Sequence, residues 1–270
     1  MVQPLPAGYV FDPDDPRAPT REQWAEMAPP ERARVVDMLP TSVPLELNPP
    51  EGDQHRKAKR GALDALDDFF RRTGRKIYLS SELVVFYPNE RRFAPDLLAV
   101  LDVEPHDRTR WVVTTEGKGL DFVLEVHVAG DRVKDHEVNV ERYARLGIHE
   151  YFIFDRTPPR LHGYRLAPGA RIYQRIVPQA GRFACEVLGL DLVLDGDRLR
   201  FFAGNALLED ADERISRLGA MLDKVLARED DLAARLAEAQ QLREDEQLRR
   251  EDAERQLAEA RAEIERLKRG

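Results

Sequence analysis

The spacing of hydrophobic residues changes character twice along the chain, at about residues 50 and 207. Between these points, apolar runs of strand length alternate with two stretches of helical spacing, at 53–74 and 132–147. The strands are expected at 76–87, 92–102, 120–130 and 150–155, and a β-hairpin extension at 161–202. The order helix, three strands, helix, strand predicts an α/β layer with at least one crossover connection, in a single folded domain at 51–206.

Residues 1–50 have a different composition from the rest of the chain. They hold 11 of its 18 prolines, so this leader cannot form one continuous helix. Two short helices are predicted. "REQWAEMA" follows a capping box of Thr20 and Gln23, and "PPERARVVDML" begins with proline at a tolerated position. We expect the leader to pack on the domain through Trp24, Val35, Val36 and Leu39.

The third part, residues 207–270, shows a heptad pattern. With Ile215 as position a, one register of a and d positions continues to Leu267, which predicts a coiled coil. A helix with so narrow an apolar stripe seldom folds alone, so residues 210–268 are expected to join copies of the chain into a homo-oligomer. A single solvated helix remains the alternative, because charged residues interrupt the seam at Glu229, Arg243, Glu246 and Arg250.

Composition limits the classes of function. The formal net charge is −8 although 34% of residues are charged, so a contact with nucleic acid must be local. The single cysteine, Cys185, excludes an internal disulfide and a cysteine metal cluster. The start of the chain does not resemble a signal peptide, and no apolar run is long enough to span a membrane, so we expect a cytoplasmic protein.

Several common catalytic motifs are missing from the sequence. No phosphate-binding glycine loop, Gly-x-Ser-x-Gly or His-Glu-x-x-His occurs, which argues against a serine hydrolase or a zincin. The 6 histidines are scattered along the chain, which makes a multi-histidine zinc centre improbable.

Polar residues interrupt the predicted strand "DFVLEVHV". Because side chains alternate along a strand, Glu125 and His127 share one face of it. A buried carboxylate costs several kcal/mol unless a partner neutralises it. Asp96 lies in a similar position, between Pro95 and the apolar run 97–101. If the two strands are neighbours, Asp96 and Glu125 could converge on a divalent cation, and their hard oxygen ligands suit Mg²⁺ or Mn²⁺.

Each of these residues also has a purely structural interpretation. Glu125 could pair with an arginine such as Arg142 on the following helix, and Asp96 could cap a turn after Pro95. His127 could be hydrogen-bonded across the sheet. Because both acids occur together, with His127 on the same strand face as Glu125, we favour the metal site over these structural interpretations.

Three segments together resemble a known family: "APDLLAV", "FVLEVHV" and "KDHEVNVERYARLGIHEYFIFD". The order of their landmark residues resembles that of the Uma-type restriction endonuclease family, a branch of the PD-(D/E)XK nuclease superfamily. The resemblance covers about residues 50–165. The resemblance implies a restriction-endonuclease-like fold, an α/β mixed sheet flanked by helices. It also implies Mg²⁺ (or Mn²⁺) held by Asp96, Glu125 and the carbonyl of Val126, and hydrolysis of phosphodiester bonds, with DNA as the expected partner.

The chain departs from the pattern of this family at its lysine. In the superfamily a lysine two residues after the glutamate helps to activate water, and His127 stands there. Uma-type relatives often carry the lysine four residues after the acid that matches Asp135, where this chain has Asn139. Lys134 is close enough to compensate. The candidate catalytic residues are therefore Asp96, Glu125, His127 and Lys134.

Cations that could contact phosphates cluster at 55–60, 71–76 and 90–92. The candidate DNA-binding residues are His55, Arg56, Lys57, Lys59, Arg60, Arg91 and Arg92. Any one of these runs alone could be an ordinary solvated face. The missing lysines leave a second hypothesis open, a catalytically inactive nuclease-fold interaction module that acts through its coiled coil.

Overall fold

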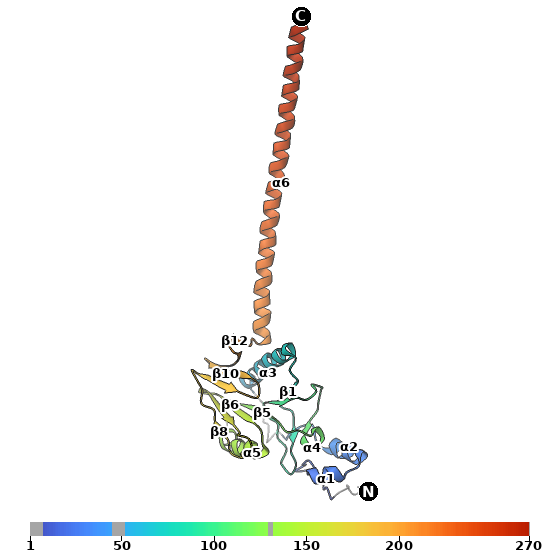
Figure 1. The fold of residues 1–270 in the computed structure, drawn as a ribbon, viewed down its shortest axis with the longest axis vertical. Helices are drawn as coiled ribbons and strands as arrows, with labels where there is room; N and C mark the ends of the chain where they lie inside the picture. The colour runs from blue at the N-terminus through green and yellow to red at the C-terminus, as the bar shows by residue number, and fades with distance from the viewer. Residues whose placement is uncertain (1–7, 45–51, 129–131, 270) are drawn as a thin grey trace. The chain divides into compact units, whose positions relative to one another are not determined.

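A computed structural model describes residues 8–44, 52–128 and 132–269, with side chains up to residue 267 (Figure 1). The chain separates into two compact units, Met1–Ala211 and Asp212–Gly270.

A six-stranded mixed sheet forms the centre of the first unit. Its spatial order is β1-β3-β5-β6-β7-β8, and β5 and β6 are parallel while the other neighbours are antiparallel. The strands are β1 (Ile77–Ser80), β3 (Leu97–Leu101), β5 (Phe122–His127), β6 (Glu150–Arg156), β7 (Pro159–Arg165) and β8 (Gln174–Arg175). A helical segment connects the parallel pair, so the predicted α/β layer with a crossover is confirmed.

One face of this sheet packs against α3 (Asp53–Thr73) and a second sheet. Helix α3 ends at Gly74, whose φ of 69° is a left-handed conformation that suits glycine. It contributes Ala62, Leu66 and Phe70 to the core. The second sheet is antiparallel and consists of β9 (Arg182–Cys185), β10 (Leu190–Asp195), β11 (Arg198–Ala203) and β12 (Ala206–Leu207).

The opposite face is covered by the crossover segment between β5 and β6 (Figure 1). This segment begins with a wide π-helical turn, η1 (Lys134–Val138), and continues as α5 (Asn139–Leu146). Tyr143 of α5 packs edge-on against Tyr151 of β6, with ring centroids 4.9 Å apart. The polar residues of the candidate site lie under this segment, as described below.

The predicted strand at 76–87 is wrong as a single strand. The chain turns at Glu82, which has a φ of 55° and donates its N–H to the carbonyl of Pro95. The apolar run that follows leaves the main sheet, and its strand β2 (Val85–Phe86) pairs in parallel with β4 (Trp111–Val112), just before α4 (Val113–Glu116). A left-handed residue cannot continue a strand, which explains the break.

The leader forms the two short helices expected of it, α1 (Arg21–Glu26) and α2 (Pro29–Met38). The Thr20–Gln23 capping box is present. Val35 and Leu39 are buried, Trp24 and Val36 are half-buried, and Leu39 packs with Val84, Phe86 and Val112 of the domain.

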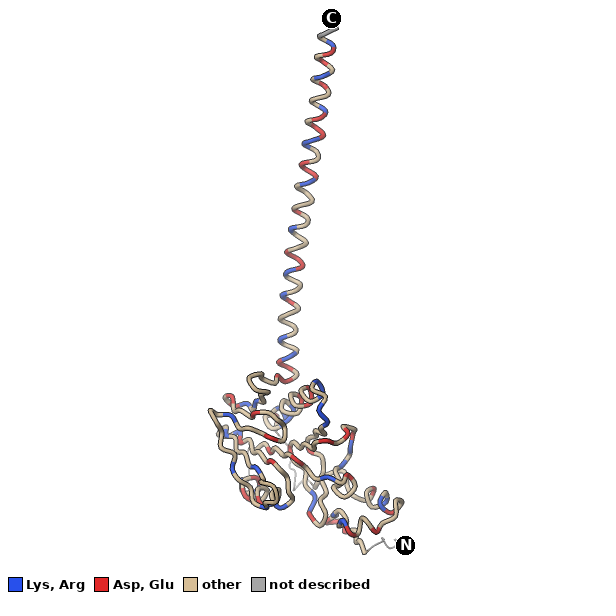
Figure 2. Tube along the Cα trace, in the orientation of Figure 1, with Lys and Arg blue, Asp and Glu red and all other residues tan. Residues whose placement is uncertain are grey.

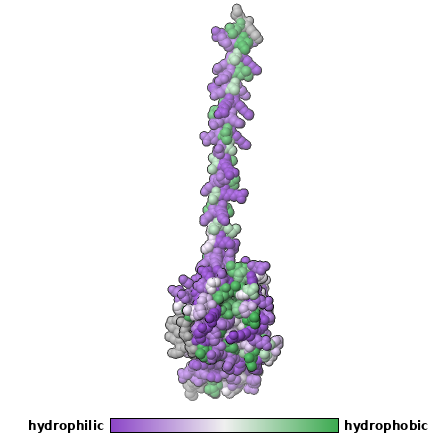
Figure 3. Space-filling view, turned by 90° about the vertical axis from the view of Figure 1, so that its left-hand side faces the viewer, coloured by the Kyte–Doolittle hydropathy of each residue, from purple (hydrophilic) through white to green (hydrophobic). Residues whose placement is uncertain are grey.

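The second unit is a single helix, α6 (Ala211–Arg269), which continues through Gly219 despite a cost of about 1 kcal/mol for glycine in a helix. The expected long C-terminal helix is confirmed. Lys and Arg alternate with Asp and Glu along it (Figure 2), and apolar side chains recur on its surface (Figure 3). Leu222, Leu232 and Leu236 are 57–61% exposed. Among the described residues, no helix combines the length and hydrophobicity that a membrane crossing requires.

Candidate active site

Asp96 and Glu125 are neighbours across the β3–β5 pair. The register places Leu97 opposite Leu124, so Asp96 faces Glu125 at the start of β3. The N–H of Asp96 donates to Glu125 Oε2 over 3.2 Å, and the N–H of Val126 donates to Asp96 Oδ2 over 2.7 Å. Each carboxylate is therefore held by the strand that carries the other, and both are buried.

Among the described residues, no arginine pairs with Glu125 in the way considered above. Arg142 instead lies 3.2 Å from Glu90 and over the ring of Phe93. The hydroxyl of Tyr143 donates to Glu125 Oε1 over 2.8 Å. Burial, together with the charges of Asp96 and Asp135, raises the pKa of Glu125 well above its usual value.

His55 and Lys59 of α3 face the other acid, Asp96. His55 Nε2 lies 2.9 Å from Asp96 Oδ2, and Lys59 Nζ lies 3.7 Å from Oδ1 while also pairing with Glu82. Burial by itself raises the pKa of Asp96, but the hydrogen bond and charge of His55, the Val126 N–H and Lys59 outweigh it, so the pKa is lowered. Asp96 is thus held as a carboxylate.

These contacts separate the seven candidate DNA-binding residues into two groups. His55 and the buried Lys59 lie against Asp96, inside the site. The others lie further out: Arg56, Lys57, Arg60 and Arg91 are exposed, and Arg92 is half-buried.

His127 lies against Asp135, a buried acid of η1 that the sequence pattern marks only as a family landmark. His127 Nδ1 is 3.3 Å from Asp135 Oδ2, and the amide of Asn139 donates to Asp135 Oδ1 over 3.1 Å. Burial raises the pKa of Asp135. In the sequence, Asp135 lies one helical turn before Asn139, and this spacing could have marked it as a site residue. The site therefore contains a third carboxylate.

Lys134 is exposed on η1, next to Asp135 in the chain. Burial is the largest effect on the pKa of Glu125 and of Asp135 and raises both. The positive charge of Lys134 lowers both. Lys134 is therefore near enough to these acids to influence them.

The chemistry of the donor set suits a divalent cation. Three buried carboxylates, Asp96, Glu125 and Asp135, interact electrostatically, and burial together with the negative charges of Asp96 and Asp135 raises the pKa of Glu125. Hard oxygen donors of this kind suit Mg²⁺ or Mn²⁺. The hydrogen bond from the N–H of Val126 to Asp96 fixes the Val126 peptide beside the acids.

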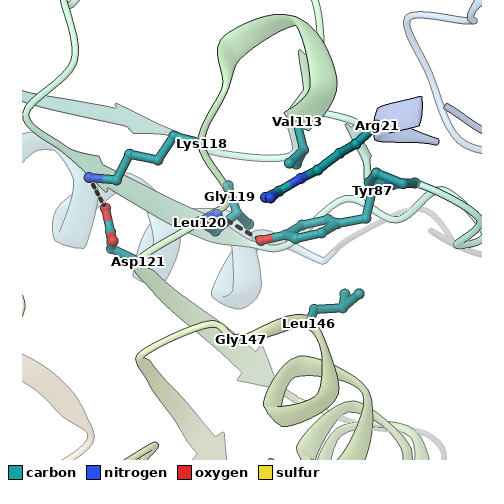
Figure 4. A pocket seen from close by; sticks show the side chains of 10 residues that line it. Arg21, Tyr87, Val113, Lys118, Gly119, Leu120, Asp121, Leu146 and Gly147 are labelled. Carbon is teal, nitrogen blue, oxygen red and sulfur yellow. Dashed lines mark hydrogen bonds and ion pairs between the residues drawn. The ribbon is translucent and has the colours of Figure 1, made fainter. Parts of the chain in front are cut away.

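A separate cavity of about 240 Å³ lies near the start of β5, away from Glu125. Figure 4 shows Lys118 and Asp121 paired on one side and the Tyr87 hydroxyl bonded to the N–H of Leu120. A side chain at Gly119 would collide with Tyr87, because an added Cβ would be 2.7 Å from its oxygen. This cavity contains none of the candidate catalytic residues.

Comparisons with known proteins bear on the family of the chain. A crystal structure of a "putative nuclease belonging to DUF820" from Anabaena variabilis is 12% identical, with a TM-score of 0.40 over 52% of this chain and 75% of that one. No curated protein matches the sequence. Residues 44–195, more than half of the chain, match the Uma2 family, described as "Putative restriction endonuclease". The chain therefore belongs to the Uma2 family.

Proposed function

We propose that the protein is an endonuclease that hydrolyses phosphodiester bonds of DNA and depends on Mg²⁺ or Mn²⁺ held by Asp96, Glu125 and the carbonyl of Val126. The observation that carries this proposal is the pair of buried carboxylates on adjacent strands, each of which accepts a hydrogen bond from a backbone N–H of the other's strand. A purely structural acid pair in this position would be destabilising, because each negative charge disfavours the other. Sites that store such unfavourable charge are frequently functional.

A bound divalent ion would supply charge for a scissile phosphate and lower the pKa of a water molecule. The protein's own groups prepare the site for it. His55 and the Val126 N–H fix the orientation of Asp96, and Tyr143 fixes that of Glu125. Ligands held in this way need little reorganisation when an ion binds.

Two residues are candidates for the proton transfers of hydrolysis. His127 has its Nδ1 next to Asp135, so Nε2 is the ring nitrogen that would take a proton from water. Lys134, whose charge acts on both Glu125 and Asp135, could instead orient the water or stabilise developing negative charge.

DNA would be bound by the exposed cations. Arg56 and Arg60 lie on the same helix as His55, which contacts Asp96, so phosphates bound along α3 would be led toward the acids. Their ion pairs with Asp53 and Asp64 are exposed, and pairs of that kind are weak enough for phosphate to replace.

We further propose that two chains associate through α6. Its apolar a and d residues are more than half exposed in the single chain, and a coiled coil would bury them. A pair of nuclease units would then be tethered in one particle.

Nicking of supercoiled plasmid tests the proposed activity. Wild type is expected to nick with Mn²⁺ or Mg²⁺ and to stop in EDTA, whereas Glu125→Ala and Asp96→Asn should be inactive with either ion. Glu137→Ala, which removes an exposed acid of the same region, is the matched control and should retain activity. Absence of cleavage by wild type on double-stranded, single-stranded and structured substrates would refute the proposal.

The second candidate is a catalytically inactive interaction module. Two observations favour it: His127 and Asn139 stand at the two positions where the family resemblance leads us to expect a lysine, and the amide of Asn139 is bonded to Asp135. Calorimetric titration with Mn²⁺, read together with the nicking assay, separates the two functions, because an inactive module that keeps its acids would bind the ion without cleaving.

A further inference from the structure

A second group of potential metal ligands lies beside the acids. His136 of η1, Asp155 of β6 and His162 of β7 bring one ligand atom each to within 4.8 Å of one another. His136 Nε2 is 3.0 Å from Asp155 Oδ1, and His162 Nε2 is 3.3 Å from Asp155 Oδ2. Side chains from two adjacent strands and from η1 thus converge on one carboxylate.

The sheet register explains the convergence. His127 pairs with Asp155 across the parallel strands, and His162 pairs with Ile153, so the three polar side chains belong to one face. His136 covers this face from η1, and its ring is edge-on to both His127 and His162, at 6.3 and 5.0 Å between centroids. The group therefore continues the row that begins with Glu125.

We propose that His136, Asp155 and His162 form a second metal site, distinct from the acid pair, which takes a divalent transition ion of the Zn²⁺ class. Imidazole nitrogens favour Zn²⁺ and its neighbours, whereas Mg²⁺ prefers an all-oxygen set. Tetrahedral Zn²⁺ with bonds of about 2.0–2.1 Å holds its ligand atoms about 3.3 Å apart. The two histidines lie 3.0 and 3.3 Å from the two oxygens of Asp155, and one ligand atom from each residue lies within 4.8 Å of the others. Three protein ligands would leave a fourth position for water or a phosphate oxygen.

Two further features of the group agree with this assignment. The buried Nε2 of His162 faces Asp155 but is not in hydrogen-bonding geometry with any described residue. The almost fully buried Asp155 also needs a positive partner.

Arg132 supplies that positive charge in the structure. Its Nη2 lies 2.6 Å from Asp155 Oδ2 and 3.5 Å from His136 Nε2, and its side chain is 45% exposed. The guanidinium can therefore move into solvent when a metal ion takes its place. The competing interpretation is a permanent ion-pair network of Arg132, Asp155 and the two histidines.

The experiment is a Zn²⁺ titration of the full-length protein by competition with a chromogenic chelator, in saturating Mg²⁺ so that the acid pair is occupied. Wild type is expected to bind one Zn²⁺ per chain. His136→Gln and His162→Gln keep size and polarity at partly exposed positions but remove a ligand. Each should lower Zn²⁺ affinity by more than the roughly 10- to 100-fold that loss of an outer-shell partner costs.

Two control variants locate the ion. His149→Gln changes an exposed histidine outside the group and should bind Zn²⁺ as wild type does. Glu125→Ala removes the proposed nuclease centre and should also retain Zn²⁺, so a failure of the nuclease proposal would leave this one standing. The proposal is overturned if wild type binds no Zn²⁺, if both histidine variants bind it unchanged, or if Glu125→Ala abolishes binding.

Discussion

His55 Nε2 lies 2.9 Å from Asp96 Oδ2, although 41 residues separate the two along the chain. The contact connects α3, which carries exposed cations, to the carboxylate pair on the sheet. His55 and Lys59 together lower the pKa of Asp96 against the effect of burial. The helix proposed to receive DNA thus also sets the charge of the candidate metal ligand.

His55 is therefore expected to be a positioning residue. His55→Ala should weaken Mn²⁺ binding by about 10- to 100-fold, as is typical when an outer-shell partner is lost, and should lower nicking accordingly. His55→Gln can still donate a hydrogen bond to Asp96 and should recover much of both. Calorimetry with Mn²⁺ checks the first effect and plasmid nicking the second. Equal loss in both variants would mean that the imidazole acts as more than a hydrogen-bond donor.

Glu125→Gln should stabilise the metal-free protein while it abolishes cleavage. The substitution removes a buried charge that repels Asp96 and Asp135, and the amide can still bond to Tyr143. A higher free energy of unfolding than that of wild type is therefore expected. Urea unfolding in EDTA measures it. A less stable Glu125→Gln protein would show that Glu125 is a structural residue.

The shifted pKa values of Asp96 and Glu125 predict that the stability of the protein depends on pH. The raised pKa of Glu125 gives a stabilising contribution that is complete below the ordinary value of 4.5 and is lost as the pH rises toward the folded-state pKa. The lowered pKa of Asp96 acts in the opposite sense, with a contribution that is lost as the pH falls below 3.8. In EDTA, wild type should therefore lose stability relative to Glu125→Gln as the pH rises above the ordinary value of 4.5. Parallel stability curves over this range would contradict the assignment.

Lys134→Ala should slow nicking by about 10²- to 10⁴-fold if this lysine replaces the one missing from the family pattern. Mn²⁺ affinity should change much less, because Lys134 is not a ligand. Lys224→Ala, at an exposed position of α6, is the control for loss of a lysine. If Lys134→Ala cleaves normally, His127→Ala becomes the decisive variant.

Association through α6 depends on the apolar seam. Leu222→Asp combined with Leu236→Asp places two charges at a positions that are 58% and 61% exposed in the single chain, and should convert the oligomer to a monomer. Ala227→Asp combined with Ala234→Asp places the same charges on the outer face and should leave the mass unchanged. Light scattering distinguishes these outcomes, and a monomeric wild type would remove the coiled-coil proposal.

The sequence predicts the parts of the site that depend on local alternation. Glu125 and His127 share a face because strand side chains alternate, and Asp96 lies across from Glu125 because β3 and β5 are neighbours. Contacts between residues far apart in the sequence could not be predicted in this way. The histidines look scattered in the sequence, yet the register of β5, β6 and β7 gathers His127, His136 and His162.

Two further features could not be predicted from local pattern. Lys59 belongs to a basic run that is typical of a solvated face, but tertiary packing buries it between Glu82 and Asp96. The segment after Ser80 is apolar enough for the central sheet, and only the backbone at Glu82 diverts it to β4.

The widened turn of η1 has a consequence for how the protein could change over time. It directs Asp135 toward His127 and the next residue, His136, toward Asp155. Consecutive residues on one short segment would thus serve the two proposed centres, which differ in chemistry. An insertion or deletion that restored a regular helical turn would rotate both side chains at once, so the spacing of this segment should tolerate length variation far less than the surface loops do.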